Sequence, residues 1–450
     1  MNLNKMLLQR HAAGKPVTVG VVGAGKFGTM FLTQARTTTG MHVVAVADLN
    51  VARARSQLTM ASWPAEQFEA TSFDDAIKSG KTFITDDSEA MIAHPGIEVI
   101  VEATGDPKTG IRLCLKSIEN GKHIVMVNVE ADALAGPLLA RRAAKAGVVY
   151  SLAWGDQPAL VCEHVDWARA AGFRVVSAGK GTRYHPTYHQ STPDTVWGIL
   201  DKYMKFRDED RGSINPKMFN SFVDGTKSGI EMTAICNATG LHSQTEGLSF
   251  PPATRFEVAQ ICKPKSDGGV LEKKGVTEVT SSVYRDGTDV PNNLVMGTYV
   301  VFEAAEDNDY ARRCFVEYSM LQDKSGRYAA LYRPIHMIGL ELGISVASAA
   351  LRKEPTGAPF CFNSDVVATA KRNLKAGKML DGEGGFCVWG KQTPASASLE
   401  HGYLPLGLAH NVKLKNDIAE GQRVKWSDVD FDASDVAVKV RREMEETFRT

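Results

Sequence analysis

The sequence of 450 residues lacks an excess of either charge, because Lys and Arg together number 52 and Asp and Glu together also number 52. A formal net charge of zero gives no support to bulk electrostatic binding of nucleic acid or of a membrane surface. Apolar runs of about 18 residues, the length that a membrane span requires, are also missing. The start of the chain has neither the apolar region nor the cleavage site of a signal peptide. We therefore expect a cytoplasmic protein with neither a nucleic-acid nor a membrane partner.

Cysteine pairs are missing as well. The seven cysteines are scattered and none belongs to a CxxC pair, which argues against a zinc cage or a disulfide framework and predicts reduced thiols. No spacing of acidic or histidine side chains is a metal signature, so the ligands of a divalent metal (Mg or Mn) stay unknown. The candidate hard ligands are Glu130, Asp132 and Glu231. Glu163, His164 and Asp166 share one helix, where we expect core or surface roles.

What the sequence does contain is an alternation of apolar strands with helices. Hydrophobic residues make up 43% of the chain and charged residues 23%, as in ordinary globular proteins. The expected strands cover 17–22, 42–47, 99–102, 123–128 and 148–152, and the expected helices include 111–120 and 138–146. Strands that alternate with helices predict βαβ units and a parallel sheet, which is an α/β fold.

Changes in composition predict three domains. Residues 1–154 are expected to form a Rossmann domain, and residues 155–355 a central α+β domain for catalysis and dimerisation. Residues 356–450 are expected to form a small β-rich C-terminal domain that ends in an amphipathic helix from Ser434 onward. We interpret the charges of that helix as a solvated face.

A glycine motif follows the first apolar strand. Its residues are Gly23, Ala24, Gly25, Lys26, Phe27 and Gly28, which match G-x-G-x-x-G. The motif opens a helix, and an acid follows at Asp48, so the full context of a dinucleotide fingerprint is present. The first glycine permits the tight turn, the second lets the backbone approach a pyrophosphate, and the third lets the helix pack on the strand. A glycine-rich turn of another α/β domain is the alternative.

The residues expected to discriminate between NAD and NADP favour different cofactors. Asp48 can accept hydrogen bonds from the ribose hydroxyls, which favours NAD. Arg53 and Arg55 follow closely and could bind a 2′-phosphate, so the sequence leaves the cofactor open. Ala103, Thr104 and Gly105 follow a buried strand, where a loop can meet the nicotinamide half or form a plain turn.

Four segments within roughly the first 240 residues resemble the homoserine-dehydrogenase-like oxidoreductases. They read VGVVGAGKFG, VIVEATG, HIVMVNVEAD and DGTKSGIEMTAICNATG. This chain carries Glu130 where the family has a lysine in the third segment. In the fourth segment, Lys227 and Glu231 stand where the family has an acid and a lysine, which argues against the homoserine reaction itself.

In length and segment order the whole chain resembles the DRL proteins, the deoxyxylulose-phosphate-reductoisomerase-like enzymes. The resemblance implies a homodimer that uses NADPH to convert 1-deoxy-D-xylulose 5-phosphate to 2-C-methyl-D-erythritol 4-phosphate for isoprenoid biosynthesis. The C-terminal segments also resemble the SAF domain of sialic-acid synthases and flagellar chaperones.

Two polar segments and one helix start supply candidate groups for a small phosphorylated sugar. Cations and hydrogen-bonding side chains are dense in 180–194 and 326–336, as a phosphosugar site requires. The alternative for 180–194 is a polar loop at a dimer interface. Lys227 and Glu231 share a helix face, either as a site or as a surface ion pair, and the family likeness makes Lys227 the candidate general acid. We expect catalytic roles for Lys180, His185, Lys227 and Glu231, and substrate-binding roles for Arg183, Tyr184, His189, Arg327, Arg333 and His336.

Two other functions stay open at this point. One is an NAD(P)-dependent dehydrogenase of a hydroxy acid or sugar acid that works without skeletal rearrangement. The other is a non-enzymatic binding module with a Rossmann sensor domain and a carbohydrate-binding SAF domain. The density of Lys, His, Tyr and Arg in the middle of the chain argues against the binding module.

Overall fold

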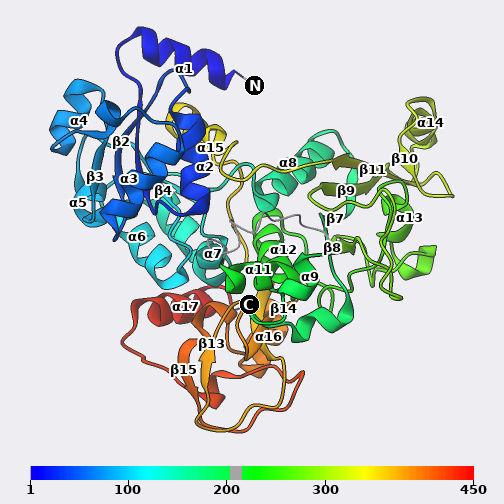
Figure 1. The fold of residues 1–450 in the computed structure, drawn as a ribbon. Coiled ribbons are helices and arrows are strands. Elements are labelled where there is room, and N and C mark those ends of the chain that lie inside the picture. The colour runs from blue at the N-terminus through cyan, green and yellow to red at the C-terminus, as the bar shows by residue number, and fades with distance from the viewer. Residues whose placement is uncertain (1, 203–214, 450) are drawn as a thin grey trace. The chain divides into compact units, whose positions relative to one another are not determined.

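The structure is a computed structural model that describes residues 2–202 and 215–449 (Figure 1). The chain divides into two compact units. The first unit comprises residues 1–160 and 336–360, and the second comprises residues 161–335 and 361–450. The return of 336–360 to the first unit was not indicated by the sequence, and the three-domain division stays a prediction. Among the described residues, no helix is long and apolar enough to cross a membrane.

The first unit contains a six-stranded parallel sheet with the order β3-β2-β1-β4-β5-β6. This is the strand order of a Rossmann fold, in which the order of the strands reverses between β1 and β4 while all strands stay parallel. The central strands are rich in buried valine and isoleucine because helices cover both faces of the sheet. The strands are β1 (Val17–Val22), β2 (Met41–Ala47), β3 (Phe83–Thr85), β4 (Val99–Glu102), β5 (His123–Met126) and β6 (Tyr150–Leu152).

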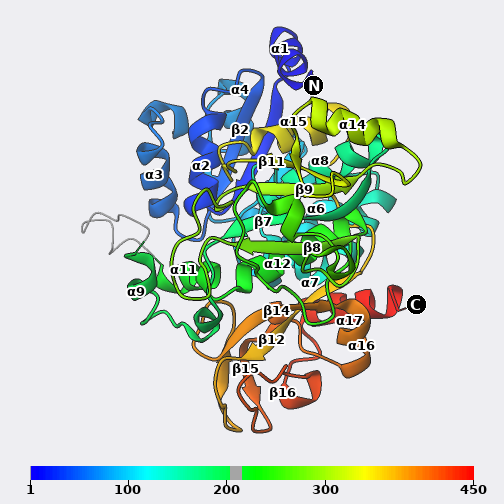
Figure 2. The ribbon, with the colours of Figure 1, turned by 90° about the vertical axis from the view of Figure 1, so that its right-hand side faces the viewer.

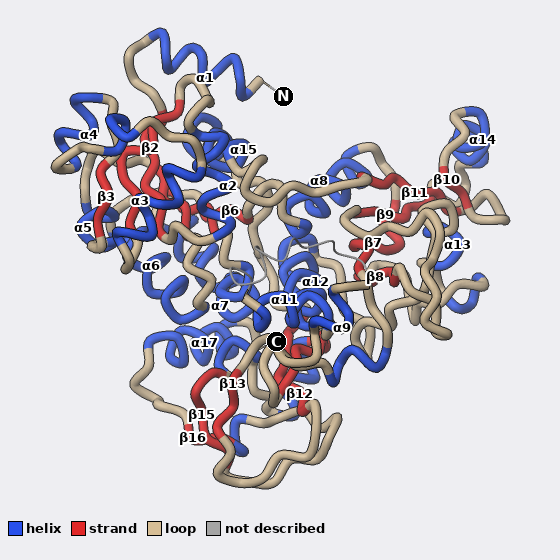
Figure 3. Tube along the Cα trace, viewed as in Figure 1, coloured by secondary structure: helices blue, strands red, loops and turns tan. Residues whose placement is uncertain are grey.

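Helices flank the strands of the first unit on both sides (Figure 3). One face packs against α1, α2, α3 and α15, and the other packs against α4, α5 and α6. Helix α15 reaches this core from far along the sequence, through Val346, Ala347 and the preceding Leu342. The helices are α1 (Leu3–Ala12), α2 (Lys26–Ala35), α3 (Val51–Met60), α4 (Phe73–Ser79), α5 (Ser88–Ala93), α6 (Pro107–Glu119), α7 (Val129–Lys145) and α15 (Gly343–Arg352).

The second unit is built on a mixed five-stranded sheet with the order β10-β11-β9-β7-β8. Strand β7 pairs in parallel with β8 and antiparallel with β9, and β9 pairs antiparallel with β11. The strands are β7 (Arg174–Thr182), β8 (Val276–Ser281), β9 (Thr298–Glu303), β10 (Leu321–Gln322) and β11 (Tyr328–Arg333).

Each face of this sheet has its own apolar core. Residues of α8 (Gln157–Ala170) and α12 (Thr226–Thr239) pack against one face, and α13 (Val258–Ile261) packs against the other. The shorter helices α9 (Trp197–Leu200) and α11 (Pro216–Val223) form a small cluster of their own. Helix α14 (Asp309–Glu317) joins β9 to β10 and buries Phe315 in the first of these cores.

The last ninety residues of the second unit are rich in strands, and the strands β12 and β14 lie beside α12 (Figure 2). Strand β12 (Ser364–Ala370) pairs with β14 (Val388–Pro394), while β13 (Met379–Asp381), β15 (His410–Leu414) and β16 (Val429–Asp430) form a second sheet. Helices α16 (Ala395–His401) and α17 (Val436–Thr447) complete this part. The fully buried Arg441 of α17 joins it to β12 through a two-bonded ion pair with Asp365.

The expected α/β class is confirmed, and two expected boundaries are corrected. Helix α7 begins at Val129, nine residues earlier than expected, so Glu130 lies in its first turn and not in a strand-loop. The Asn128 side chain accepts the Ala131 N–H at 3.1 Å and caps that helix. Lys180 lies within β7 and not in the polar loop that follows it.

Candidate functional site

The glycine turn joins β1 to α2, where the three glycines have different roles. Gly23 has φ +96°, and a Cβ there would lie 2.6 Å from the carbonyl oxygen of Ala103. A Cβ on Gly28 would lie 2.1 Å from the carbonyl oxygen of Gly23. The Cβ position of Gly25 has no atom within 4 Å, so the backbone at the first turn of α2 is open to an approaching group. Free N–H groups at a helix N-terminus are suited to bind the pyrophosphate of a dinucleotide.

Asp48 lies at the end of β2, and both of its oxygens are already hydrogen-bonded. The N–H groups of Ala24 and Asn50 donate to them at 2.8 Å, and Arg53 donates to both, at 2.8 and 2.7 Å. Burial alone would raise the pKa of Asp48, but these bonds, above all those from Arg53, hold it below its ordinary value. The carboxylate is nearly enclosed, whereas the Arg53 side chain is 54% exposed. The group that this corner presents to solvent is therefore a guanidinium.

The loop of Ala103, Thr104 and Gly105 lies against the glycine turn, because the Ala103 N–H donates to the carbonyl of Val22 at 2.8 Å. Glu102 directly precedes this loop and accepts hydrogen bonds from the N–H of Thr104, at 3.0 Å, and from its hydroxyl. Burial raises the pKa of Glu102 to about 7, although the hydrogen bonds from Thr104 act to lower it. The cofactor candidates from the three strand ends thus lie at one edge of the sheet, as parallel strands dictate.

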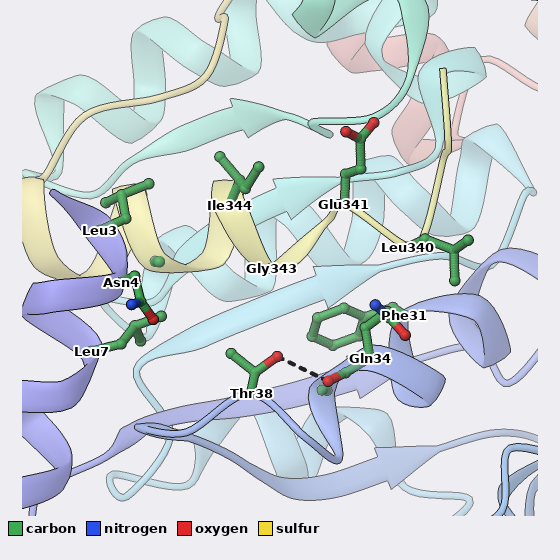
Figure 4. A pocket seen from close by; sticks show the side chains of 12 residues that line it. Leu3, Asn4, Leu7, Phe31, Gln34, Thr38, Leu340, Glu341, Gly343 and Ile344 are labelled. Carbon is green, nitrogen blue, oxygen red and sulfur yellow. Dashed lines mark hydrogen bonds between the residues drawn. The ribbon is translucent and has the colours of Figure 1, made fainter. Parts of the chain in front are cut away.

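A cavity of about 340 Å³ in the first unit lies away from this edge (Figure 4). It is formed by α1, the second half of α2 and α15, whereas the glycine motif ends at Gly28 in the first turn of α2. Its lining is mainly apolar, with Leu3, Leu7, Phe31 and Ile344. The cavity is therefore separate from the candidate dinucleotide site.

In the second unit, Lys180 and Glu231 form a buried ion pair between β7 and α12. Their side chains are 6% and 3% exposed. Lys180 is in register with Thr298 on β9, which in turn is in register with Arg333 on β11. Residues directly opposite each other on antiparallel strands share a face of the sheet. Lys180, Thr298 and Arg333 therefore form one row on the face that α8 and α12 cover.

His164 joins this row from α8. Its Nε2 lies 3.0 Å from the hydroxyl of Thr298, and burial, with a smaller effect of Arg333, lowers its pKa to about 4. We expected a core or surface role for His164. A signal was present, because Val161, Val165 and Ala168 at helical spacing place His164 near the apolar face of its helix. We name Lys180, Glu231, His164, Thr298 and Arg333 the Lys180 cluster.

The loop that follows β7 carries the other candidates of the first polar segment. Arg183 forms an ion pair with Asp289 at 2.8 Å, and the His185 ring contacts Thr187 and the carbonyl of Arg285. The Tyr184 ring stacks on Phe250 with 3.8 Å between centroids. Its hydroxyl lies 2.8 Å from Nε2 of His189. Lys227 is half-buried one helical turn before Glu231.

The structure does not bring all candidates of the second polar segment together. Arg327 precedes β11 and pairs with Glu303 at 3.0 Å, at the opposite end of the sheet from Arg333. Six residues of extended strand separate the two arginines by about 20 Å. His336 belongs to the first unit, where its Nδ1 lies 3.5 Å from Nε2 of Gln157.

The candidate metal ligands are dispersed. Asp132 is buried and accepts a hydrogen bond from Tyr150 at 2.8 Å, and burial raises its pKa to about 7. Glu231 belongs to the Lys180 cluster of the other unit, and Glu130 lies in the first turn of α7. Within residues 2–202 and 215–449, no group of three or more His, Cys, Asp and Glu side chains could hold a metal ion.

Sequence reasoning missed two charged groups that the fold encloses. Glu102 was read only as the end of a strand, and Lys371 was not singled out at all. An acid or a lysine directly after a run of apolar strand residues, as in VIVE and VVATAK, is the one signal that could have identified them.

Comparisons with known proteins agree with the cofactor geometry. Residues 17–127 match the family described as "Oxidoreductase family, NAD-binding Rossmann fold". Residues 155–342 match the family described as "Oxidoreductase DRL, catalytic domain". The chain is therefore an NAD(P)-dependent oxidoreductase with a Rossmann domain, and its residues 155–342 are similar to the DRL catalytic domain.

Among curated proteins, the chain is similar to homoserine dehydrogenases. It is 30% identical to that of Methylobacillus glycogenes over 123 residues, which are 25% of each chain. It is 38% identical to that of Pseudomonas aeruginosa over 71 residues, which are 16% of each chain. The chain thus spans a quarter or less of the length of these relatives.

Among solved structures, the chain is similar to dihydrodipicolinate reductase from Paenisporosarcina sp. TG-14, with 12% identity and a TM-score of 0.35. That match covers 76% of this chain and 97% of the other. It is also similar to a myo-inositol dehydrogenase from Corynebacterium glutamicum, with 11% identity and a TM-score of 0.27, over 41% of this chain and 53% of the other.

Proposed function

We propose that the protein is an NADPH-dependent reductoisomerase that converts 1-deoxy-D-xylulose 5-phosphate to 2-C-methyl-D-erythritol 4-phosphate. The observation that carries this proposal is the match of residues 155–342 to the DRL catalytic domain, the region that contains the Lys180 cluster. The homoserine dehydrogenases match a much shorter part of the chain, and they add support for the oxidoreductase class only.

The first unit supports NADPH over NADH. A ribose 2′-hydroxyl needs an accepting carboxylate, but the oxygens of Asp48 already accept four hydrogen bonds. A 2′-phosphate needs a cation, and the half-exposed Arg53 at the same corner provides one whose own position is fixed by Asp48. The open backbone at Gly25 is suited to the pyrophosphate.

The overall reaction consumes the ketose phosphate, NADPH and one proton, and yields the branched polyol phosphate and NADP⁺. When bound, the cofactor supplies the hydride that reduces the branched aldehyde formed by fragmentation and re-addition of the carbon skeleton. The protein must hold a phosphate dianion, polarise the ketone and move a proton.

The groups of the second unit fit these tasks. We assign Lys227 to the carbonyl oxygen, as the donor of a proton at its Nζ. Lys180 and Glu231 form a buried ion pair, and we assign this pair to proton transfer with a substrate hydroxyl inside the site. Arg183 and Arg333 are the proposed phosphate ligands, with His185 beside them as an acid–base group. The side chains of Tyr184 and His189 order the loop that carries them.

The direct test supplies the purified protein with 1-deoxy-D-xylulose 5-phosphate and NADPH. We expect stoichiometric loss of NADPH and formation of 2-C-methyl-D-erythritol 4-phosphate, identified by mass spectrometry and NMR. Gly25→Val, which places a side chain where the pyrophosphate lies, should abolish NADPH binding in a fluorescence titration. Turnover of homoserine or another hydroxy acid, without turnover of the ketose phosphate, would show that the dehydrogenase alternative is correct. Failure to oxidise NADPH with any phosphosugar would revive the binding-module alternative.

The Lys180 cluster is tested by Lys180→Met, which removes a group expected to act in the transition state. Both kcat and kcat/KM should fall together by ~10²-fold or more. Lys274→Met is the control, because Lys274, which precedes β8, also pairs with a glutamate of this sheet, Glu303 of β9, at 2.6 Å. If the Lys180 variant stays folded and its kcat is no lower than that of the Lys274 variant, the Lys180 cluster does not belong to the active site.

Three further expectations stay predictions. The DRL resemblance implies a homodimer, the composition implies a cytoplasmic location, and the C-terminal segments resemble a SAF domain. Sedimentation velocity on the purified protein tests the first of these.

A further inference from the structure

The C-terminal segment (residues 361–449) contacts both parts of the second unit that carry candidate site residues. One is the β7 loop (residues 183–191), and the other is the start of α12, from Asp224 to Lys227. At the β7 loop the contacts fall on three successive residues, His189, Gln190 and Ser191. Their partners in the C-terminal segment are Trp389, Glu420 and Lys371. Each partner lies 180 or more positions later in the sequence, so the contacts depend on the fold and not on local turns.

Lys371 is the centre of these contacts. It follows the last residue of β12, and its side chain is 2% exposed. Its ammonium donates to the carbonyl oxygens of Ser191 at 2.7 Å and Gly385 at 2.8 Å. It also lies 2.7 Å from a carboxylate oxygen of the fully buried Asp224. The ammonium thus joins three different segments: it donates to the end of the β7 loop and to the turn before β14, and it pairs by charge with the carboxylate at the start of α12.

The His189 ring is held between the same segments. It stacks on Trp389 of β14 with 3.7 Å between centroids and 20° between planes. Its Nδ1 lies 2.7 Å from the carbonyl oxygen of Asp224, so Nδ1 carries the proton and Nε2 accepts from the Tyr184 hydroxyl. Burial lowers the pKa of His189 to about 4, with smaller effects of Lys391 and Lys371. The ring is therefore neutral and its orientation is fixed.

The start of α12 is tied to β14 as well. The Gly390 N–H donates to the Thr226 hydroxyl at 2.9 Å. The Asp224 carboxylate accepts the Thr226 N–H at 2.9 Å on one oxygen and faces Lys371 with the other. Lys227 is the next residue of this helix, and Glu231 follows one turn later.

We propose that the C-terminal segment completes the substrate site of the second unit, and that Lys371 is a positioning residue for both the β7 loop and the first turn of α12. In this arrangement Lys371 touches no substrate. It fixes the distance between the loop that carries Arg183 and His185 and the helix that carries Lys227 and Glu231. The kinetic part of this inference rests on the proposed function, and its structural part does not.

The test uses two variants of the full chain. Lys371→Met combined with Asp224→Asn removes the pair without leaving a buried charge unpaired, and the side-chain amide that replaces the carboxylate keeps an oxygen for the Thr226 N–H. Trp389→Leu removes the stacking contact and leaves Lys371 in place. The control is Lys375→Met, which removes an exposed lysine that pairs with Asp417 at 2.7 Å in the same C-terminal segment.

Amide hydrogen exchange without substrate tests the structural part. We expect the N–H groups of Tyr188, Ser191 and Thr226 to exchange about tenfold faster in both variants, because their hydrogen bonds depend on the fixed loop and helix start. The amides of β12 paired with β14 should stay protected, which shows that the segment is still folded. Unchanged exchange at these three amides in the double variant would overturn the proposal.

Steady-state kinetics test the positioning role. We expect KM for the phosphorylated substrate to rise about tenfold or more, while the affinity for NADPH changes less than about twofold. A purely structural role would lower kcat in proportion to the folded fraction and leave KM unchanged, and that result would also overturn the proposal. If the wild-type protein does not turn over the ketose phosphate but exchange responds as expected, the proposed function fails and the positioning role of Lys371 stands.

Discussion

At the scale of single residues, Arg53 and Asp48 act as one group. Asp48 fixes the guanidinium from inside, and the exposed part of that guanidinium is free to meet a phosphate. Neither residue indicates the cofactor by itself. The acid at the end of β2 is typical of NAD binding, whereas the arginine can bind the 2′-phosphate of NADP. Their ion pair supports the proposed preference for NADPH.

This pairing gives the first prediction. Wild-type protein should favour NADPH over NADH in kcat/KM, and Arg53→Ala should lower that ratio by about tenfold, which corresponds to about 1.4 kcal/mol. The variant removes the phosphate ligand and frees Asp48 to accept from a 2′-hydroxyl, so activity with NADH should not fall. Kinetics with both cofactors measure the ratio. Arg55→Ala is the control, since Arg55 contacts the Phe68 carbonyl only weakly, at 3.4 Å. A wild-type preference for NADH of about tenfold would contradict the assignment.

Glu102 gives a prediction about pH. Its pKa is raised from 4.5 to about 7 in the folded protein, so the folded chain binds more protons than the unfolded chain between these values. The free energy of unfolding that Glu102 contributes is thus complete below pH 4.5 and is lost as the pH rises through 7. Glu102→Gln keeps an oxygen for Thr104 but does not titrate.

We therefore expect the Gln variant to gain stability relative to wild type as the pH rises, by on the order of 3 kcal/mol in total. Urea unfolding at a series of pH values measures this difference. Asp132 titrates in both proteins and cancels from the comparison. Glu119→Gln, an exposed change on α6, should show no such dependence. Parallel pH profiles for wild type and Glu102→Gln would mean that Glu102 is not a protonated buried acid.

At the scale of elements, the two ends of the five-stranded sheet have different roles. Arg333 ends β11 in the row of the Lys180 cluster, whereas Arg327 precedes the same strand and pairs with Glu303. Sequence proximity suggested a shared phosphate grip for the two arginines. The two arginines are six residues apart in sequence but about 20 Å apart in space, because an extended chain advances about 3.3 Å per residue.

The sheet therefore predicts opposite outcomes for two matched substitutions. Arg333→Lys should raise KM for the phosphorylated substrate by about tenfold, because a lysine does not reproduce a two-bonded guanidinium contact. Arg327→Lys should stay close to wild-type kinetics, since it retains a cation beside Glu303. Steady-state kinetics with a thermal melt for each variant decide between them. An effect confined to Arg327→Lys would place the phosphate at the other end of the sheet.

The same contrast explains which parts of the molecule the sequence could predict. The glycine motif, β1, β2 and β4 depend on local patterns, and the structure has them within one residue of the expected bounds. The Lys180–Glu231 pair, the contact of Lys371 with Asp224 and the separation of Arg327 from Arg333 depend on strand pairing and on contacts between distant segments. No periodicity within one sequence window carries that information, although the residue types were visible.

At the scale of the whole molecule, the chain leaves the first unit after Leu160 and returns to it at His336. Helix α15 packs on the Rossmann sheet together with α1 and α2, and it buries Val346 and Ala347 there. The hydroxyl of Ser345 also accepts the Trp154 N–H at 2.7 Å. A segment nearly two hundred residues downstream is thus part of the cofactor-binding unit.

This topology predicts how NADPH binding changes amide exchange. A ligand that binds the folded first unit and is present at a concentration of about 100 times its Kd stabilises the region that unfolds together with the site by about 2.7 kcal/mol. The slowly exchanging amides of α15 should therefore gain protection together with those of β1 and α2, although α15 lies far from them in sequence. Hydrogen exchange followed by mass spectrometry measures this, and Gly25→Val, which should not bind NADPH, is the control. If β1 and α2 gain protection while α15 does not, then α15 opens independently of the Rossmann sheet and does not belong to its cooperative unit.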